Sequence, residues 1–424
     1  MRIPFLPGAG GDPVARGGLA RLGLAFALAW VAVAMTAAPG SVAWVALSKN
    51  PGDAGAFFAA FSAGAAVGAL VGGRAMDRFG RRIVLVAAYV AAALGYATAG
   101  AGYAFGSLAI FSAGAVLLAA GTGAVYLTRL AAADLLPVNE RGRGVAFVQV
   151  CATFGAVLGP TLLSLSGPLG TWLGADPRSF VWFIAPPLLL LAAFVIFRGP
   201  EPLAIARARA AATPAASAVA ASAPASGAAR VVVLAAAFAT LAAAQAAMVG
   251  VMGVTGAALE HAGHGVEAMG FTMALHFIGM FGLSLVVGRL ADRAGRRPTL
   301  LAGQVILAAG ALGVAYVPGL AGHAIGLLVV GLGWSFAYIA STVLVADLVP
   351  LERRARVMGA ADLATSLFVV LVVMGSGIVY GQRGLEGVGL VAAALALLPA
   401  VLVLASKEPA RAPAPLAAAA PPAK

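Results

Sequence analysis

The chain consists mostly of uninterrupted apolar runs, each about 20 residues long, separated by short turns that carry most of its charges. Hydrophobic residues make up 62% of the sequence and charged residues only 10%. A run of that length crosses a bilayer as one α-helix, and it lacks the alternation of a membrane β-barrel strand. Since the backbone must satisfy its hydrogen bonds inside lipid, the sequence predicts an all-α polytopic membrane protein.

Twelve such runs are present, and a low-complexity stretch rich in Ala, Pro and Ser divides them into two groups of six. The predicted units are a cytoplasmic tail at 1–20, a six-helix bundle at 21–198, a flexible cytoplasmic linker at 199–229, a second six-helix bundle at 230–406 and a tail at 407–424. The predicted spans cover about 22–46, 54–76, 83–102, 108–130, 145–166, 180–197, 231–259, 266–290, 299–317, 324–345, 357–381 and 387–405.

The net charge of +12 comes from arginines that gather in alternate turns. Clusters at 78–82, 293–297 and 353–356 alternate with turns that hold only single basic residues. This is the positive-inside pattern, and it places both termini in the cytoplasm. We therefore interpret the excess of basic residues as a sign of how the chain is oriented in the membrane. The expected partner is the lipid bilayer, and we expect no binding of nucleic acid.

A motif rich in glycine and arginine occurs once in each half. Its residues are Gly73, Asp77, Arg78, Gly80 and Arg81 in the first copy, and Gly288, Asp292, Arg293, Gly295 and Arg296 in the second. A second motif, Ala-Asp-Leu-x-Pro at 133–137, recurs at 346–350 with nearly the same offset. Two different motifs repeated at nearly one offset indicate a duplicated six-helix unit.

The physical chemistry of this motif suits a conformational latch. Its first glycine allows close helix approach, and its aspartate can accept bonds from arginines or from a neighbouring helix N-terminus. The paired G-x-x-x-D-R-x-G-R-R loops resemble the signature of the major facilitator superfamily, over essentially the whole chain. That resemblance implies two six-helix bundles with a pathway between them. The alternative is that both loops are ordinary basic cytoplasmic turns.

Methionine and histidine are concentrated in one segment of the second half. Five of the ten methionines and three of the four histidines lie within 248–280. Met248 and Met252 are one turn apart on one predicted helix, and His276 and Met280 are one turn apart on the next. Thioethers and imidazole are ligands that suit Cu(I), so we predict a soft-metal site. Met248 and His276 are equally far from the middle of the intervening turn, which predicts one common depth.

Further candidate ligands lie around that intervening turn. They are His261, His264, Met269 and Met273. A capture region at the outer mouth is one interpretation of these residues, and ordinary solvated turn residues are the other. Core packing by methionine is the alternative for the whole metal set.

The pair M-x-x-x-M and H-x-x-x-M resembles the CcoA-type branch of the superfamily. This resemblance implies a secondary transporter that imports copper, as Cu(I) or a chelate, across the bacterial inner membrane for assembly of cbb3-type cytochrome c oxidase. The ligands would be Met248, Met252, His276 and Met280. Copper would be the transported substrate, with no prosthetic group, and copper chaperones are candidate partners.

Two other functions stay open. Gly155-x3-Gly159-Pro160 partly matches a motif of drug/proton antiporters, although a small-residue packing face explains it as well. Such an exporter needs an acidic residue deep in the first half, and the nearest candidate elsewhere is Asp362, close to a cytoplasmic helix end. A non-transporting copper receptor or chaperone would not need the paired loops. We expect no enzyme, because the spans hold no acid–base pair and no nucleophile with a base.

Overall fold

The computed structural model describes residues 12–50, 53, 56–172, 174, 177–212, 227–263 and 266–406. Throughout these ranges the chain is helical and forms no β-strand. The helices of the first half are α1 (Pro13–Ser48), α2 (Ala56–Phe79), α3 (Arg81–Ala104), α4 (Leu108–Val125), α5 (Thr128–Asp134), α6 (Arg141–Trp172) and α7 (Pro177–Phe197). Those of the second half are α10 (Gly227–His261), α11 (Val266–Phe277), the π-helix η4 (Ile278–Gly282), α12 (Ser284–Arg293), α13 (Arg296–Tyr316), α14 (Gly319–Leu348), α15 (Arg354–Leu397) and α16 (Ala400–Ala405).

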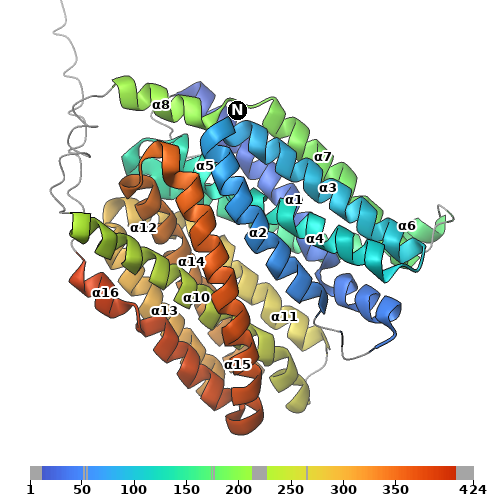
Figure 1. The fold of residues 1–424 in the computed structure, drawn as a ribbon. Coiled ribbons are helices and arrows are strands. Elements are labelled where there is room, and N and C mark those ends of the chain that lie inside the picture. Colours follow the sequence, from blue (N-terminus) through green and yellow to red (C-terminus); the bar gives the residue numbers. More distant parts are fainter. Residues whose placement is uncertain are drawn as a thin grey trace, which may run out of the picture.

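In the described ranges, eleven helical stretches are long and apolar enough to cross a membrane. The last of them, Leu351–Ala405, runs for 55 residues and contains Gly384, whose φ of 60° and ψ of −160° interrupt α15. The chain reverses direction there, so this stretch supplies two crossings (Figure 1). The prediction of an all-α protein with twelve membrane helices is thereby confirmed.

The first helix begins earlier than the sequence suggested. α1 starts at Pro13, and the Asp12 carboxylate caps it by accepting a hydrogen bond from the Val14 N–H at 2.8 Å. A proline in the first turn loses no intrahelical bond, so the pair favours a helix start. The expected loose tail at 1–20 is therefore corrected to a helix from Pro13 onward, and residues 1–11 lie outside the described part.

The linker also differs from the prediction. Its first part forms α8 (Pro202–Ala212), which lies against the first half. Arg209 of α8 donates a hydrogen bond to the Leu135 carbonyl at 3.0 Å, beyond the C-terminus of α5. The expectation of a flexible segment over 199–229 is thus wrong for α8, whereas residues 213–226 and the predicted tail at 407–424 lie outside the described residues.

The two halves pack against each other through equivalent helices. α2 of the first half lies along α15 of the second, and α12 of the second half lies along α6 of the first. Figure 1 shows the first of these pairs, with α2 in blue beside the orange part of α15. Because α2 and α12 carry the two copies of the repeated motif, the contact between the halves is itself duplicated.

The glycines of α6 serve packing inside the first half. An ideal Cβ on Gly155 would lie 2.6 Å from the Trp30 Cβ of α1, and one on Gly159 would lie 2.7 Å from the Ala34 Cβ. Close backbone approach of this kind drives helix association in lipid, where the hydrophobic effect does not act between helices. A packing face therefore accounts for the partial antiporter motif.

Candidate functional site

The first copy of the repeated motif ties the two halves together. Asp77 of α2 accepts hydrogen bonds from the backbone N–H groups of Ala355 at 3.2 Å and Arg356 at 2.8 Å. Those N–H groups belong to the first turn of α15, where they have no partner inside the helix. The carboxylate therefore caps α15 and faces the positive end of its dipole. Gly73 permits this approach, since a Cβ there would overlap the Ala355 carbonyl.

Arg81 extends the contact into a chain of alternating charges. Its guanidinium donates to Asp77 at 2.9 Å and to Asp134 at 3.0 Å. Arg354 of the second half donates to the other oxygen of Asp134 at 2.8 Å. All four side chains are buried, so each charge is compensated by its neighbours rather than by water. We call Asp77, Arg81, Asp134 and Arg354 the first latch.

The second copy of the motif makes the same contact with the halves exchanged. Asp292 of α12 accepts hydrogen bonds from the backbone N–H groups of Gly142 and Arg143, both at 3.0 Å. These residues form the first turn of α6, so a carboxylate again caps a helix of the opposite half. Gly288 repeats the role of Gly73, since a Cβ on it would lie 2.5 Å from the Gly142 carbonyl oxygen.

Asp347 completes this second network as Asp134 completes the first. Arg296 of the same half donates to Asp347 at 3.0 Å, and Arg141 of the other half donates to it at 2.6 Å. We call Asp292, Arg296, Asp347 and Arg141 the second latch. The repeated Ala-Asp-Leu-x-Pro motif thus supplies the central carboxylate of each latch, a role that its sequence alone did not reveal.

The remaining motif residues have other places. Gly80 and Gly295 precede α3 and α13 with φ values of 93° and 109°, a backbone conformation that favours glycine. Arg78 lies with its guanidinium 5.1 Å from the centroid of the Phe79 ring. Arg293 is the last residue of α12.

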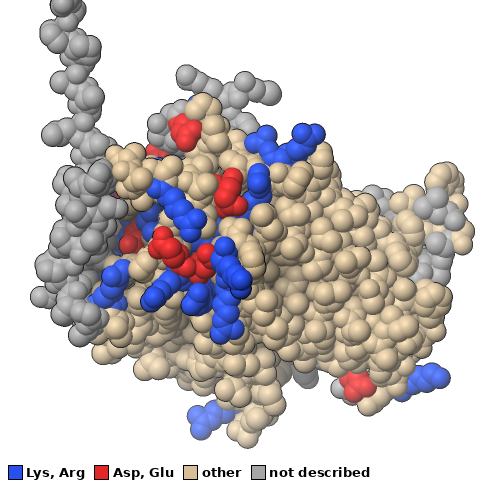
Figure 2. All heavy atoms as spheres, turned by 45° about the horizontal axis from the view of Figure 1, so that its top comes forward, with Lys and Arg blue, Asp and Glu red and all other residues tan. Residues whose placement is uncertain are grey.

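The charged side chains gather at one end of the molecule, which we call the arginine-rich end. Figure 2 shows Lys and Arg interleaved with Asp and Glu over this end, beside broad uncharged surfaces. Both latches lie there, because their aspartates are in the last turns of α2, α5, α12 and α14 and their arginines begin the helices that follow. The positive-inside rule predicts that this end faces the cytoplasm.

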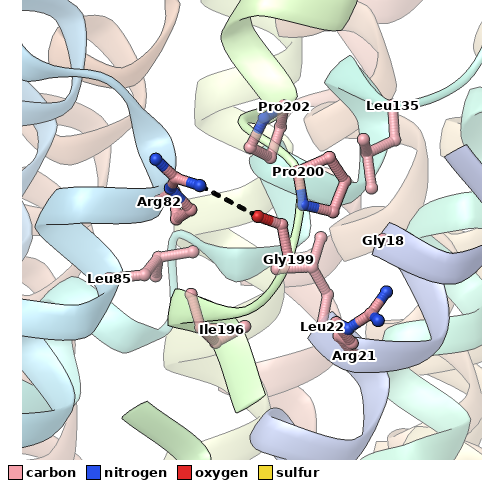
Figure 3. A pocket seen from close by; sticks show the side chains of 10 residues that line it. All are labelled: Gly18, Arg21, Leu22, Arg82, Leu85, Leu135, Ile196, Gly199, Pro200 and Pro202. Carbon is pink, nitrogen blue, oxygen red and sulfur yellow. Dashed lines mark hydrogen bonds between the residues drawn. The ribbon is translucent and has the colours of Figure 1, made fainter. Parts of the chain in front are cut away.

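A small hollow at the same end marks where the linker packs. Figure 3 shows Arg82 donating to the Gly199 carbonyl, at 3.1 Å, beside Leu22 and Ile196. The hollow measures about 10 Å³, which is room for about one water molecule. Glu201, just beyond it, accepts a hydrogen bond from the Arg82 N–H at 3.0 Å and so caps α3. This is a packing seam that fixes the linker rather than a solute site.

A further ion pair joins the halves deeper in the molecule. Arg129 of α5 donates to Asp362 of α15 at 2.6 Å and to the hydroxyl of Tyr338 in α14. Its guanidinium also lies over the Tyr338 ring, 4.4 Å from the centroid. The Arg129 side chain is 2% exposed and that of Asp362 is 17% exposed. A charge pair so enclosed between two halves of a membrane protein is a candidate functional site.

Aromatic rings from both halves form a connected chain that reaches this ion pair through Tyr338. Trp30 of the first half lies 6.1 Å from Tyr126 and 4.9 Å from Phe281 of the second half, between ring centroids. Phe281 lies 6.0 Å from Trp334, which stacks on Tyr338 at 4.5 Å. We call these five residues the central aromatic cluster. The cluster includes rings of both halves. A transport pathway between the bundles stays a prediction.

Sequence reasoning did not single out Arg129, and it treated Asp362 as a residue of a helix end. Its only signal in the sequence was weak, because Arg129 stands one residue before the end of the predicted apolar span at 108–130, where a basic residue is ordinary. Its partner was not visible, since Asp362 lies 233 residues further along the chain. Aromatic residues scattered over four helices likewise give no local pattern.

The predicted metal ligands lie in the second half. His276 is fully buried, and its Nδ1 lies 2.8 Å from the Leu327 carbonyl, which can only accept a hydrogen bond. Nδ1 therefore carries the proton and Nε2 keeps a lone pair, for which the described residues supply no partner. Met248 and Met280 are buried, and Met252 is half-buried.

The second half keeps the predicted regular helical spacing only for part of this ligand set. Met280 lies in the π-helix η4, so His276-x3-Met280 does not keep the regular α-helical register that places such pairs on one face. α10, with both methionines, packs mainly on α15 and α14, whereas α11, with His276, packs mainly on α14.

The outer candidates are described only in part. Met273 is half-buried on α11, and His261 and Met269 belong to α10 and α11, whereas His264 lies outside the described residues. Among the side chains that the structure describes, no three His, Cys, Asp or Glu lie close enough together to hold a metal ion.

The fold and the paired contacts between its halves define a polytopic membrane transporter built from two equivalent six-helix units. The family model of the Major Facilitator Superfamily matches residues 22–265 and 237–424, and the chain belongs to that superfamily.

Curated relatives agree with this assignment. The chain is 31% identical over 316 residues to the uncharacterized MFS-type transporter YdeG of Bacillus subtilis. The aligned region covers 73% of each protein. It is 29% identical over 376 residues to the riboflavin transporter RfnT of Brucella anthropi. This aligned region covers 85% of this chain and 89% of that protein.

Solved structures share the fold at lower identity. The human organic anion transporter MFSD10 matches with a TM-score of 0.74 and 18% identity, covering 92% of this chain and 100% of that one. The proton:xylose symporter XylE matches with a TM-score of 0.72 and 19% identity, covering 92% and 94%. Such likeness establishes the architecture. The copper substrate implied by the CcoA-type resemblance stays a prediction.

Proposed function

We propose that the chain is a secondary transporter that carries a small organic solute with a flat conjugated ring across the bacterial inner membrane by alternating access. The observation that carries this proposal is the central aromatic cluster, because it draws rings from both halves to one place beside Arg129 and Asp362. A solute bound there touches both halves, so its binding energy differs between their two arrangements.

Ring chemistry favours this class of solute. Flat aromatic groups stack on Trp, Tyr and Phe side chains with ring centroids about 4.5–7 Å apart, which is the spacing within the cluster itself. Binding sites for small molecules combine such apolar walls with a few polar groups that fix orientation. The similarity to RfnT, a riboflavin transporter, supports the same class, since riboflavin carries a flat tricyclic ring.

The latches fit the transport cycle. Both are formed in this structure, and both lie at the arginine-rich end, where each ties a helix start of one half to a motif loop of the other. In the proposed cycle this end is closed in the observed arrangement, and both latches release when it opens. With the arginine-rich end in the cytoplasm, the observed arrangement is closed toward the cytoplasm.

Binding to the purified protein tests the proposal. Riboflavin, the flat compound phenazine, xylose and Cu(I) would each be titrated into the protein in detergent, with quenching of tryptophan fluorescence or a thermal shift as readout. We expect a flat compound to bind and Trp334→Leu to weaken its binding. Trp44→Leu on α1 is the matched control, because Trp44 packs on Phe111 within the first half, at 6.0 Å. Binding of xylose or Cu(I) alone would contradict the proposal.

Copper import for cytochrome oxidase assembly is the second candidate. The observation that favours it is the buried Nε2 of His276, whose lone pair has no partner among the described residues while a carbonyl orients the ring. Radioactive copper accumulation would be measured in cells without their own importer, comparing wild type with Met248→Ala, Met252→Ala, His276→Ala and Met280→Ala at equal membrane abundance. Unchanged accumulation with the wild-type protein would exclude import.

The same cells also distinguish the two remaining alternatives, which are an exporter and a non-transporting copper receptor. A wild-type protein that lowers cellular copper or confers drug resistance would indicate export. A non-transporting copper receptor would keep its copper-dependent effect when Asp77 or Asp292 is replaced, since it does not need the latches.

A further inference from the structure

The ion pair between Arg129 and Asp362 leaves polar atoms unused. The pair makes a single bond from Nη2 to Oδ1, at 2.6 Å, and Nη1 bonds to Tyr338. In the described part of the chain, Arg129 Nε and Asp362 Oδ2 are buried and have no hydrogen-bond partner. An unpaired buried donor or acceptor costs free energy, so two of them in one ion pair are unusual in a native protein.

A third unused atom belongs to the central aromatic cluster. Trp30 Nε1 is buried and without a partner among the described residues. Trp30 stacks on Tyr126, and the Tyr126 carbonyl accepts a long hydrogen bond from Arg129 Nη1 at 3.5 Å. The central aromatic cluster and the ion pair meet where the Arg129 guanidinium lies over the Tyr338 ring. Between them they leave two N–H donors and one carboxylate acceptor without partners among the described residues.

This set selects a ligand by its hydrogen-bonding pattern. Two donors and one acceptor are complemented by a ligand edge with two acceptors and one donor, which is the pattern of a cyclic imide, C=O, N–H, C=O. A carboxylate group offers no donor to Asp362 Oδ2, and an ammonium group offers no acceptor to Arg129 Nε or Trp30 Nε1. Because Arg129 and Asp362 neutralise each other, the ligand that leaves the pair intact is uncharged.

We propose that Arg129, Asp362 and Trp30 form hydrogen bonds with the imide edge of a neutral, planar heterocycle. The ring of this ligand would lie among the side chains of the central aromatic cluster. Pyrimidinedione rings, including the one within riboflavin, belong to this chemical class. The inference rests on the proposed function, because it assigns a substrate class to the same site. The new element is selectivity: the site would distinguish heterocycles by whether they carry an imide N–H, and not by ring size alone.

A pair of matched ligands tests this directly. Riboflavin and 3-methylriboflavin share the ring system, but the methyl group removes the imide N–H that Asp362 Oδ2 would accept. Binding to the purified full-length protein in detergent would be measured by quenching of flavin fluorescence. We expect the wild-type protein to prefer riboflavin by about tenfold or more, because a buried polar group left unpaired penalises the analogue.

Two variants assign that preference to the named atoms. Asp362→Asn presents an amide instead of a carboxylate, and the preference for riboflavin should fall to about threefold or less. Trp30→Phe keeps the ring and removes only the N–H, so riboflavin affinity should fall by roughly two- to tenfold while the preference persists. Trp44→Phe, the same change on the same helix, should leave both ligands unaffected. If Asp362→Asn does not fold, Trp30→Phe and the ligand pair still decide the question.

The outcomes separate this inference from the proposed function. Equal binding of riboflavin and 3-methylriboflavin, both weakened by Trp334→Leu, overturns imide recognition and leaves an aromatic solute site. Binding of phenazine with no binding of either flavin also overturns imide recognition and leaves the aromatic solute site. No binding by riboflavin, 3-methylriboflavin or phenazine overturns the inference and the proposed function together.

Discussion

Arg129 holds three interactions between the halves with one side chain: an ion pair to Asp362, a hydrogen bond to Tyr338 and a contact with the ring face of that tyrosine. A guanidinium suits this combination because it is planar and has donors on several sides. The desolvation of two charges is a large cost, and the pair is stabilising only while both partners are present.

Removing one partner of this pair should therefore destabilise the protein more than removing both. Arg129→Met leaves the Asp362 carboxylate buried without its partner, and we expect a loss of about 3–5 kcal/mol in the free energy of unfolding. Asp362→Leu should have a similar effect. The double variant removes both charges and should be more stable than either single variant, as measured by thermal unfolding in detergent. Additive losses in the double variant would show that the two side chains are not coupled.

Some residues at the contacts between the halves could be identified from the sequence, and others could not, for a physical reason. Asp77 and Asp292 stood out because each recurs in a repeated motif. Their partners are backbone N–H groups at helix starts in the opposite half, which no residue type marks. Arg129 carries only a weak signal, a basic residue at the end of an apolar span, and its significance depends on Asp362 far along the chain.

The existence of each membrane helix could be predicted from the sequence more reliably than the residues at which it begins and ends, or the breaks in its regular geometry. The predicted gap between spans 357–381 and 387–405 contains Gly384, where the chain of α15 does reverse. The start of α1 was missed because Asp12 and Pro13 cap a helix before the apolar run begins. The π-helix η4 was missed as well, because a five-residue change of helical pitch scarcely alters a hydrophobic pattern.

Close packing between α2 and α15 depends on glycine at defined positions. An ideal Cβ on Gly359 would overlap the Ala69 carbonyl of the other half, whereas nothing described lies within 4 Å of one on Gly375, further along the same helix. Gly359→Ala should therefore push the halves apart and lower the melting temperature. Gly375→Ala should leave it unchanged or raise it, since alanine favours an exposed helix by roughly 0.5–1 kcal/mol.

Thermal unfolding of the two variants, side by side, checks this prediction. The substitution and the helix are the same in both, so the difference isolates the contact between the halves. An equal effect of the two substitutions would mean that Gly359 contributes only through helix propensity.

At the scale of the whole molecule, the two latches form one switch if the halves move as rigid bodies. Each latch crosses the same interface, and each caps a helix of the opposite half with a carboxylate. Opening the arginine-rich end must then break both at once. A defect in either latch should consequently weaken closure along the entire interface, including contacts on the far side of the pseudo-two-fold axis.

Cysteine labelling measures this coupling. With Cys151 replaced by alanine, Ala69→Cys reports on the α2–α15 contact and Ala146→Cys on the α6–α12 contact, since both alanines are buried there. Asp77→Ala removes the cap on α15, a loss of roughly 0.5–2 kcal/mol for such a group. We expect labelling of both cysteines by a maleimide to accelerate by about two- to thirtyfold.

Asp292→Ala should accelerate labelling of the same two cysteines by a similar factor, because it removes the equivalent cap from α6. Asp53→Ala, in the turn before α2 and outside both latches, is the control and should change neither rate. If each latch variant accelerated only the cysteine on its own side, the latches would act as separate local contacts. Acceleration of both cysteines by either variant is the result that a single rigid-body switch requires, since helices that move with their whole half cannot open on one side alone.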